Sequence, residues 1–96
     1  MQQYLVLADD YTDDEALSRR LAVRGAHLAR VSVEKTKGLF EVGGAKLNAE
    51  GKMVGSMLVI SAENETAAWQ WLNVDPYVTG KVWEKITVTM FRVANV

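Results

Sequence analysis

The chain of 96 residues has no cysteine and only one histidine. Without cysteine it can form no disulfide, cysteine-ligated zinc site or catalytic thiolate, and one histidine is poor material for a metal site. Eleven basic and twelve acidic side chains give a net charge of -1, so the positive field needed for nucleic acid or an anionic membrane is missing. G-x-G-x-x-G, Walker A and G-x-S-x-G motifs are also absent. We expect no cofactor, no metal and no nucleic-acid partner.

Long hydrophobic runs are missing as well. The first apolar run, residues 4–8, is too short for a signal peptide or a membrane span, and no lipidation signal is present. The sequence therefore predicts a cytoplasmic protein with no membrane partner. Its hydrophobic fraction of 49% is typical of an ordered globular protein, and its length fits a single domain over residues 1–96.

The first half of the chain predicts a strand followed by a long helix. Residues 4–8 form a continuous apolar run, which is typical of a buried strand. Thr12 and Glu15 match a capping box at a helix start, and Gly38 is typical of a left-handed helix end. The helical spacing predicts one apolar stripe toward the core: Leu17, Leu21, Leu28 and Val31.

The second half predicts two strands, a helix and a final strand. Residues 39–47 and 52–61 are strand-like and are joined by a polar turn, and Asn64 is a suitable N-cap for a helix over 65–72. Residues 82–93 predict the last strand. The order is β-α-β-β-α-β, so the predicted fold class is an α+β ferredoxin-like sandwich.

Both faces of the predicted sheet carry apolar side chains. Two helices cover only one face, and an exposed apolar second face is unfavourable in water. We therefore predict a homodimer joined through the open face of the sheet, each copy supplying half of an α+β barrel. Alternation along the last strand places Trp83 on that interface. The alternative is that a chain end covers the face.

His27 and Asp75 are the candidate catalytic residues. Arg24 lies one helical turn before His27, so the pair could bind an anion while the imidazole moves a proton. Asp75 would orient the imidazole or act as a base. The structural alternative for His27 is that it merely packs at a helix edge. For Asp75, which precedes Pro76, the alternative is that its carboxylate caps the turn that follows.

Ser56 and Tyr77 are candidate substrate-binding residues. Ser56 is polar within an apolar strand, and the preceding Gly55 would let a ligand approach the backbone. Tyr77 would line a pocket. The alternatives are a hydroxyl that is hydrogen-bonded within the sheet for Ser56 and simple packing for Tyr77. The pair Gly43 and Gly44 interrupts another strand and predicts a bulge or a close backbone approach.

Two segments resemble the YCII-related domain family. They are Arg-Arg-Leu-Ala-Val-Arg-Gly-Ala-His-Leu-Ala-Arg over residues 19–30, and Asp-Pro-Tyr-Val followed by Gly-Lys-Val-Trp-Glu over 75–84. The resemblance covers nearly the whole chain and implies a dimeric α+β barrel. It also implies a small-molecule pocket between the sheet and the long helix, with His27 and Asp75 as the acid/base pair and Arg24 matching the family's arginine.

The resemblance implies a cofactor-independent lyase or isomerase acting on a small, partly apolar, anionic organic molecule. Some family members are linked to the breakdown of ring-derived, sometimes halogenated, compounds. The alternative is a non-catalytic small-molecule-binding or interaction module of the same fold. One departure concerns the pocket rim: where many members have Gly-Pro after the second strand, this chain has Gly43 and Gly44.

Overall fold

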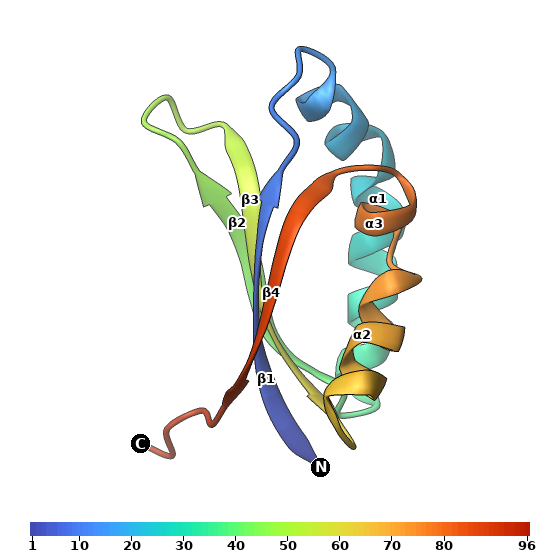
Figure 1. Cartoon of the computed structure of the whole chain (residues 1–96), viewed down its shortest axis with the longest axis vertical. Helices are drawn as coiled ribbons and strands as arrows, with labels where there is room; N and C mark the ends of the chain where they lie inside the picture. The colour runs from blue at the N-terminus through green and yellow to red at the C-terminus, as the bar shows by residue number, and fades with distance from the viewer.

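A four-stranded antiparallel sheet with helices on one face forms the protein. The computed structural model describes residues 1–96, and the strands lie in the order β2-β3-β1-β4. All three helices cover the same side of the sheet, and the other side is open (Figure 1). This α+β ferredoxin-like arrangement confirms the predicted fold class. The elements are β1 (Gln2–Asp10), α1 (Ala16–Thr36), β2 (Phe40–Leu47), β3 (Met53–Ala62), α2 (Glu65–Asn73), α3 (Pro76–Thr79) and β4 (Trp83–Phe91).

Two of the three predicted helix-end signals are confirmed. Gly38 has a φ of 76°, and the Asn64 side chain accepts a hydrogen bond from the Ala67 amide. The predicted capping box is wrong, because α1 begins after Glu15 with no side-chain cap. Asp13 occupies this end instead: its carboxylate accepts from the Glu15 amide and forms an ion pair with Arg19 at 2.7 Å.

The prediction of which face of α1 is buried is wrong. Leu21 and Leu28 are 56% and 44% exposed, whereas Arg20 and His27 are 2% and 8% exposed. Val31 is the only member of the predicted leucine and valine stripe that is buried. Burial of charged or polar side chains is favourable only where partners satisfy them, and partners on other elements do so here. The helix therefore turns a polar pair toward the sheet.

Trp83 also lies on the opposite side from the one predicted. The pairing register shifts between Asp9 and Asp10, so that Asp9 faces Lys85 while Asp10 faces Trp83. One extra residue in β4 reverses the side-chain alternation at this point. Trp83 consequently points to the helices and is 4% exposed in the core. That core is completed mainly by Tyr4, Val6, Leu58, Ile60 and Leu72.

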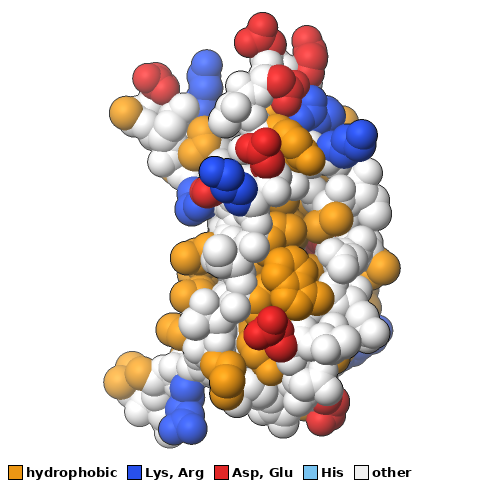
Figure 2. Space-filling model, in the orientation of Figure 1, with side chains coloured by type: hydrophobic (Ala, Val, Ile, Leu, Met, Phe, Trp, Pro, Cys, Tyr) orange, Lys and Arg blue, Asp and Glu red, His pale blue; other side chains and the backbone are white.

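The open face of the sheet carries apolar side chains, as predicted. Leu7, Val42 and Phe91 are exposed by 41%, 48% and 39%, and the pairing places Leu7 beside Met57 on β3. Figure 2, seen along the sheet, shows hydrophobic side chains on the edge that faces away from the helices. None of the helices combines the length and apolar character that crossing a bilayer requires.

Candidate active site

His27 and Asp75, 48 residues apart in sequence, are in direct contact. His27 lies in the middle of α1, and Asp75 is the N-cap residue of the short helix α3. The Nδ1 atom of His27 is 2.9 Å from Oδ1 of Asp75, and both side chains are buried. The packing of α3 against α1 brings the two together, which no local sequence pattern could establish.

The Asp75 carboxylate is completely buried and accepts three hydrogen bonds. Besides His27, the Tyr77 amide donates to Oδ1 at 2.9 Å and Nη1 of Arg30 donates to Oδ2 at 2.8 Å. Burial acts to raise the pKa of Asp75, but the bonds from His27, Tyr77 and Arg30 outweigh it, so the pKa is lowered. Asp75 therefore caps the turn that follows it and also contacts His27.

This contact defines the tautomer of His27. An ionised carboxylate can only accept, so the Nδ1 atom carries the proton and Nε2 keeps a lone pair when the ring is neutral. Nothing in the protein is hydrogen-bonded to Nε2. The Tyr77 ring stacks on the imidazole with centroids 3.9 Å apart and planes 15° apart, and the Trp83 ring meets it edge-on at 6.0 Å. The orientation of the imidazole is thus constrained from three sides.

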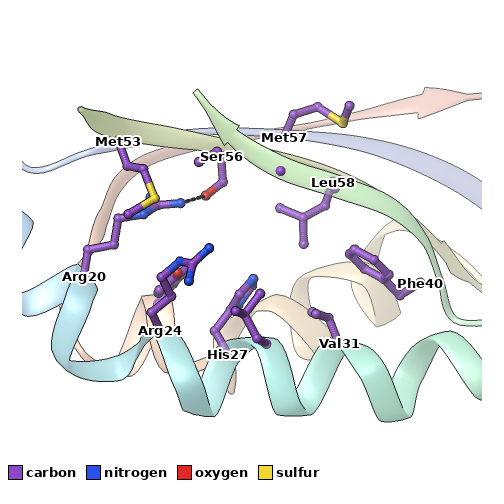
Figure 3. Close-up of a pocket in the computed structure, with 14 residues that line it drawn as sticks. Arg20, Arg24, His27, Val31, Phe40, Met53, Ser56, Met57 and Leu58 are labelled. Carbon is purple, nitrogen blue, oxygen red and sulfur yellow. Dashed lines mark hydrogen bonds between the residues drawn. The ribbon is translucent and has the colours of Figure 1, made fainter. Parts of the chain in front are cut away.

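A cavity of about 210 Å³ lies between α1 and the sheet next to His27. Figure 3 shows Arg24, His27 and Val31 pointing from α1 toward the strands, while Ser56 and Leu58 point back from β3. Met57 points to the opposite side of the sheet in the same view. The lining comprises Arg20, Arg24, His27, Leu28, Val31, Phe40, Gly43, Gly44, Ala45, Met53, Ser56, Met57, Leu58 and Tyr77. This space is mainly apolar and fits a single small ring.

Ser56 lies in the cavity wall within a buried polar network. Its Oγ accepts hydrogen bonds from Nη2 of Arg20 at 2.9 Å and from Nε1 of Trp83 at 3.0 Å. Nη1 of Arg20 is 3.0 Å from each carboxylate oxygen of Asp10, and both side chains of this ion pair are buried. Burial raises the pKa of Asp10, although the bonds from Arg20 oppose this effect.

The interpretation of Gly55 as a point of ligand approach is wrong. Gly55 pairs with Asp9 and Lys46, and a Cβ there would lie 2.4 Å from both the Ala8 carbonyl oxygen and Cε of Lys46. The missing side chain thus makes room for protein atoms. Gly43 and Gly44 do line the cavity, where a Cβ on Gly43 would come 2.8 Å from the Met57 carbonyl oxygen. The close backbone approach predicted for this pair is therefore found at Gly43 alone, since a Cβ on Gly44 would meet no atom within 4 Å.

Arg24 and Tyr77 both line the cavity, but they differ in burial. Tyr77 is 2% exposed, and burial raises the pKa of its hydroxyl. Arg24 is exposed and takes part in none of the ion pairs of the chain, so its positive charge is available to a ligand. All five residues singled out in the sequence therefore surround one cavity or directly support it: His27, Asp75, Arg24, Ser56 and Tyr77.

Four residues of the site network escaped the sequence reasoning. Arg30 stacks on the Trp71 ring at 4.0 Å while it binds Asp75, and its position three residues after His27 was the available signal. Arg20 is a charged residue on the buried side of α1, and Asp10 is a charged residue at the buried end of β1. For Trp83, no local signal indicates the register shift that turns it inward. No group of three or more His, Cys, Asp or Glu side chains is arranged to hold a metal ion.

Comparison with known sequences identifies a family and close relatives. The profile of the YCII-related domain matches residues 3–92. Protein YciI of Escherichia coli O6:H1 is 32% identical over 95 residues, which cover 93% of this chain and 95% of the relative. An uncharacterised protein of Haemophilus influenzae is 30% identical with the same coverage.

Two solved structures share the fold. The 5-chloro-2-hydroxyhydroquinone dehydrochlorinase TftG of Burkholderia phenoliruptrix AC1100, in complex with 2,5-dihydroxybenzoquinone, has a TM-score of 0.82 and 24% identity, with 96% of this chain and 95% of that chain covered. A dimeric ferredoxin-like protein of unknown function from Jannaschia sp. CCS1 has a TM-score of 0.55 and 13% identity, with 97% and 100% covered. At these identities the likeness shows the fold alone.

Proposed function

Because the chain belongs to the YCII-related domain family, we propose that it is a small-molecule enzyme that performs acid/base chemistry with His27 and Asp75. The observation that carries this proposal is the position of His27 between a buried carboxylate and an apolar cavity. The reaction is of the lyase or isomerase type and uses the side chains of the protein alone. The substrate is a small, partly apolar organic anion.

His27 is the proton-transferring group. With the Nδ1 proton directed at Asp75, the Nε2 lone pair takes a proton from the substrate, and the ionised carboxylate stabilises the resulting imidazolium. The same Nε2 then returns the proton to a leaving group or to another substrate atom. Asp75 acts through the imidazole, and Arg30 keeps that carboxylate in place.

Arg24 supplies the anion contact, since its guanidinium is unpaired at the cavity wall. Phe40, Val31 and Leu58 provide apolar walls, and a cavity of about 210 Å³ matches a single substituted ring. Ser56 and Tyr77 complete the binding surface. Removal of a proton by His27 leaves negative charge on the substrate, which the Arg24 cation stabilises.

The name of the structural relative TftG supports an elimination reaction. In a dehydrochlorination, a base removes a proton, the electron pair forms a new double bond, and chloride leaves with its bonding electrons. The overall step releases a proton and chloride without net oxidation or reduction, so the residues of the present cavity are sufficient for it. The bound 2,5-dihydroxybenzoquinone of that relative is a small oxygenated ring, in keeping with the cavity volume.

The proposal is tested by chloride release from 5-chloro-2-hydroxyhydroquinone and by binding of 2,5-dihydroxybenzoquinone. We expect turnover by the wild type and a loss of about 10²-fold or more in kcat for His27→Ala, because general base catalysis is removed. Asp13→Asn, which removes an exposed carboxylate outside the cavity, serves as the control and keeps full activity. Binding without turnover would instead favour the non-catalytic module, and equal activity of His27→Ala would refute the assignment.

We further propose that the protein is a homodimer joined through the open face of the sheet. Leu7 and its apolar neighbours are exposed there, and burial of such a face between two copies is favourable. Leu7→Lys should convert the dimer to a monomer in sedimentation analysis at micromolar concentration. Val74→Lys, which changes a 65% exposed valine on the helix side, should leave it dimeric. A monomeric wild type would refute this proposal.

A further inference from the structure

The hydroxyl of Ser56 has both of its lone pairs in use. Nη2 of Arg20 and Nε1 of Trp83 approach the oxygen at 2.9 Å and 3.0 Å. Guanidinium and indole N–H groups are donors only, so the direction of both hydrogen bonds is unambiguous. The Ser56 oxygen therefore accepts two hydrogen bonds, and only its own O–H group is still free to form another, as a donor.

That proton has no acceptor within the protein. Ser56 donates no hydrogen bond to any carbonyl or carboxylate, although the residue is only 3% exposed. Buried donors are normally satisfied by protein, water or ligand. Ser56 lines the cavity and points from β3 toward α1 (Figure 3), so the partner of its proton must come from the cavity contents.

The two donors cannot turn away from Ser56. Nη1 of Arg20 is held by both oxygens of Asp10, and the Arg20 guanidinium also lies 4.6 Å from the centroid of the Tyr77 ring. The Trp83 indole is buried with its ring edge against Tyr77 at a centroid distance of 5.4 Å. The donor character of the hydroxyl is therefore imposed by its surroundings and does not adapt to the ligand.

We propose that Ser56 is a one-way hydrogen-bond donor that selects ligands presenting an accepting oxygen, such as a carbonyl, enolate or phenolate, to the β3 wall. A ligand that presents only an N–H donor at this position meets another donor and is rejected, whereas a hydroxyl can still accept through its oxygen. The proposal rests on the proposed small-molecule pocket and narrows its ligand class. During proton removal by His27, an oxygen that gains negative charge would receive the Ser56 hydrogen bond from the opposite side of the cavity.

The test compares two probes of nearly the same shape, acetophenone and α-methylstyrene, which differ in whether a C=O or a C=CH₂ group is present. Dissociation constants are measured by protein-observed NMR titration. We expect the wild type to prefer acetophenone by about fivefold to tenfold, the effect of one hydrogen bond. Ser56→Ala should abolish the preference, and Ser56→Thr, which keeps a hydroxyl, should retain it.

A second variant tests the one-way character and does not remove Ser56. Trp83→Phe deletes the indole donor and frees one lone pair of the hydroxyl, which can then accept from a ligand. Binding of aniline, a donor probe, should improve severalfold in Trp83→Phe relative to the wild type. If Ser56→Ala does not fold, this comparison decides the question by itself.

Three results would overturn the proposal: no preference for acetophenone in the wild type, an unchanged preference in Ser56→Ala, or unchanged aniline binding in Trp83→Phe. A preference that disappears in Arg24→Met and survives in Ser56→Ala would assign the donor to Arg24 and equally reject Ser56. None of the three probes needs to react, so these outcomes are independent of whether His27 catalyses proton transfer.

Discussion

Substitution of Asp75 by asparagine tests the central contact of the site while it preserves the shape of the side chain. The carboxylate accepts from Nδ1 of His27, from the Tyr77 amide and from Nη1 of Arg30. An asparagine amide has one oxygen and one NH₂ group, so it cannot accept from all three. If the asparagine oxygen points to His27 and Tyr77, its NH₂ group faces the Arg30 guanidinium. In the reverse orientation the NH₂ group faces two donors, Nδ1–H of His27 and the Tyr77 amide.

The better orientation therefore loses the charged hydrogen bond from Arg30 and weakens the one from His27. A hydrogen bond to a charged group contributes ~1.5–3 kcal/mol, and the Arg30 side chain is partly exposed, so water replaces some of that loss. We expect the free energy of unfolding to fall by ~2–3 kcal/mol. In a domain of this size each kcal/mol lowers Tm by ~4–8 °C, which corresponds to a decrease of about 8–24 °C.

Thermal and urea unfolding followed by far-UV circular dichroism measures this difference. Asp13→Asn is the matched control, because it removes an ion pair with Arg19 whose side chains are 31% and 49% exposed. Exposed ion pairs contribute little, so its Tm should stay close to that of the wild type. If Asp75→Asn melted as high as Asp13→Asn, the buried carboxylate would not stabilise the fold through these bonds, and the reasoning would be refuted.

Two further predictions concern acid stability and a glycine. Because the pKa of Asp75 is lowered in the folded state, its stabilising contribution is complete above its unfolded pKa of about 4 and is lost as pH falls through the folded value. The difference in urea midpoint between wild type and Asp75→Asn should thus narrow below about pH 4; a constant difference would contradict this. Gly55→Ala should destabilise by ~1–3 kcal/mol in urea unfolding, since its Cβ would overlap the Ala8 carbonyl oxygen. Gly44→Ala, which meets no atom within 4 Å, should not, and similar losses for both would disprove the steric explanation.

The element order could be predicted because its signals are local. Apolar runs, the Asn64 cap and the left-handed Gly38 depend on neighbouring residues, and the structure reproduces them within a few positions. The fold class follows from that order. His27 and Asp75 could be predicted as candidates because their residue types carry acid/base chemistry, and the resemblance to the YCII-related domain family pairs them.

The buried face of α1 could not be predicted in the same way. A helical hydrophobic pattern favours Leu21 and Leu28 as core residues, and their exposure contradicts it. Arg20 is buried in their place because Asp10 on β1 and Ser56 on β3 satisfy its guanidinium. Without those distant partners the burial of arginine would be strongly unfavourable, so helix periodicity alone gives the wrong answer.

The sequence by itself determined the order of strands and helices and the apolar character of both sheet faces, because each depends on composition and short-range spacing. It also supplied the candidates for the reacting side chains. Only the tertiary structure decided that His27 meets Asp75 and that Trp83 turns inward to Ser56. Those contacts join residues far apart in the chain, and a single-residue register shift in β4 turns Trp83 to the helix side of the sheet.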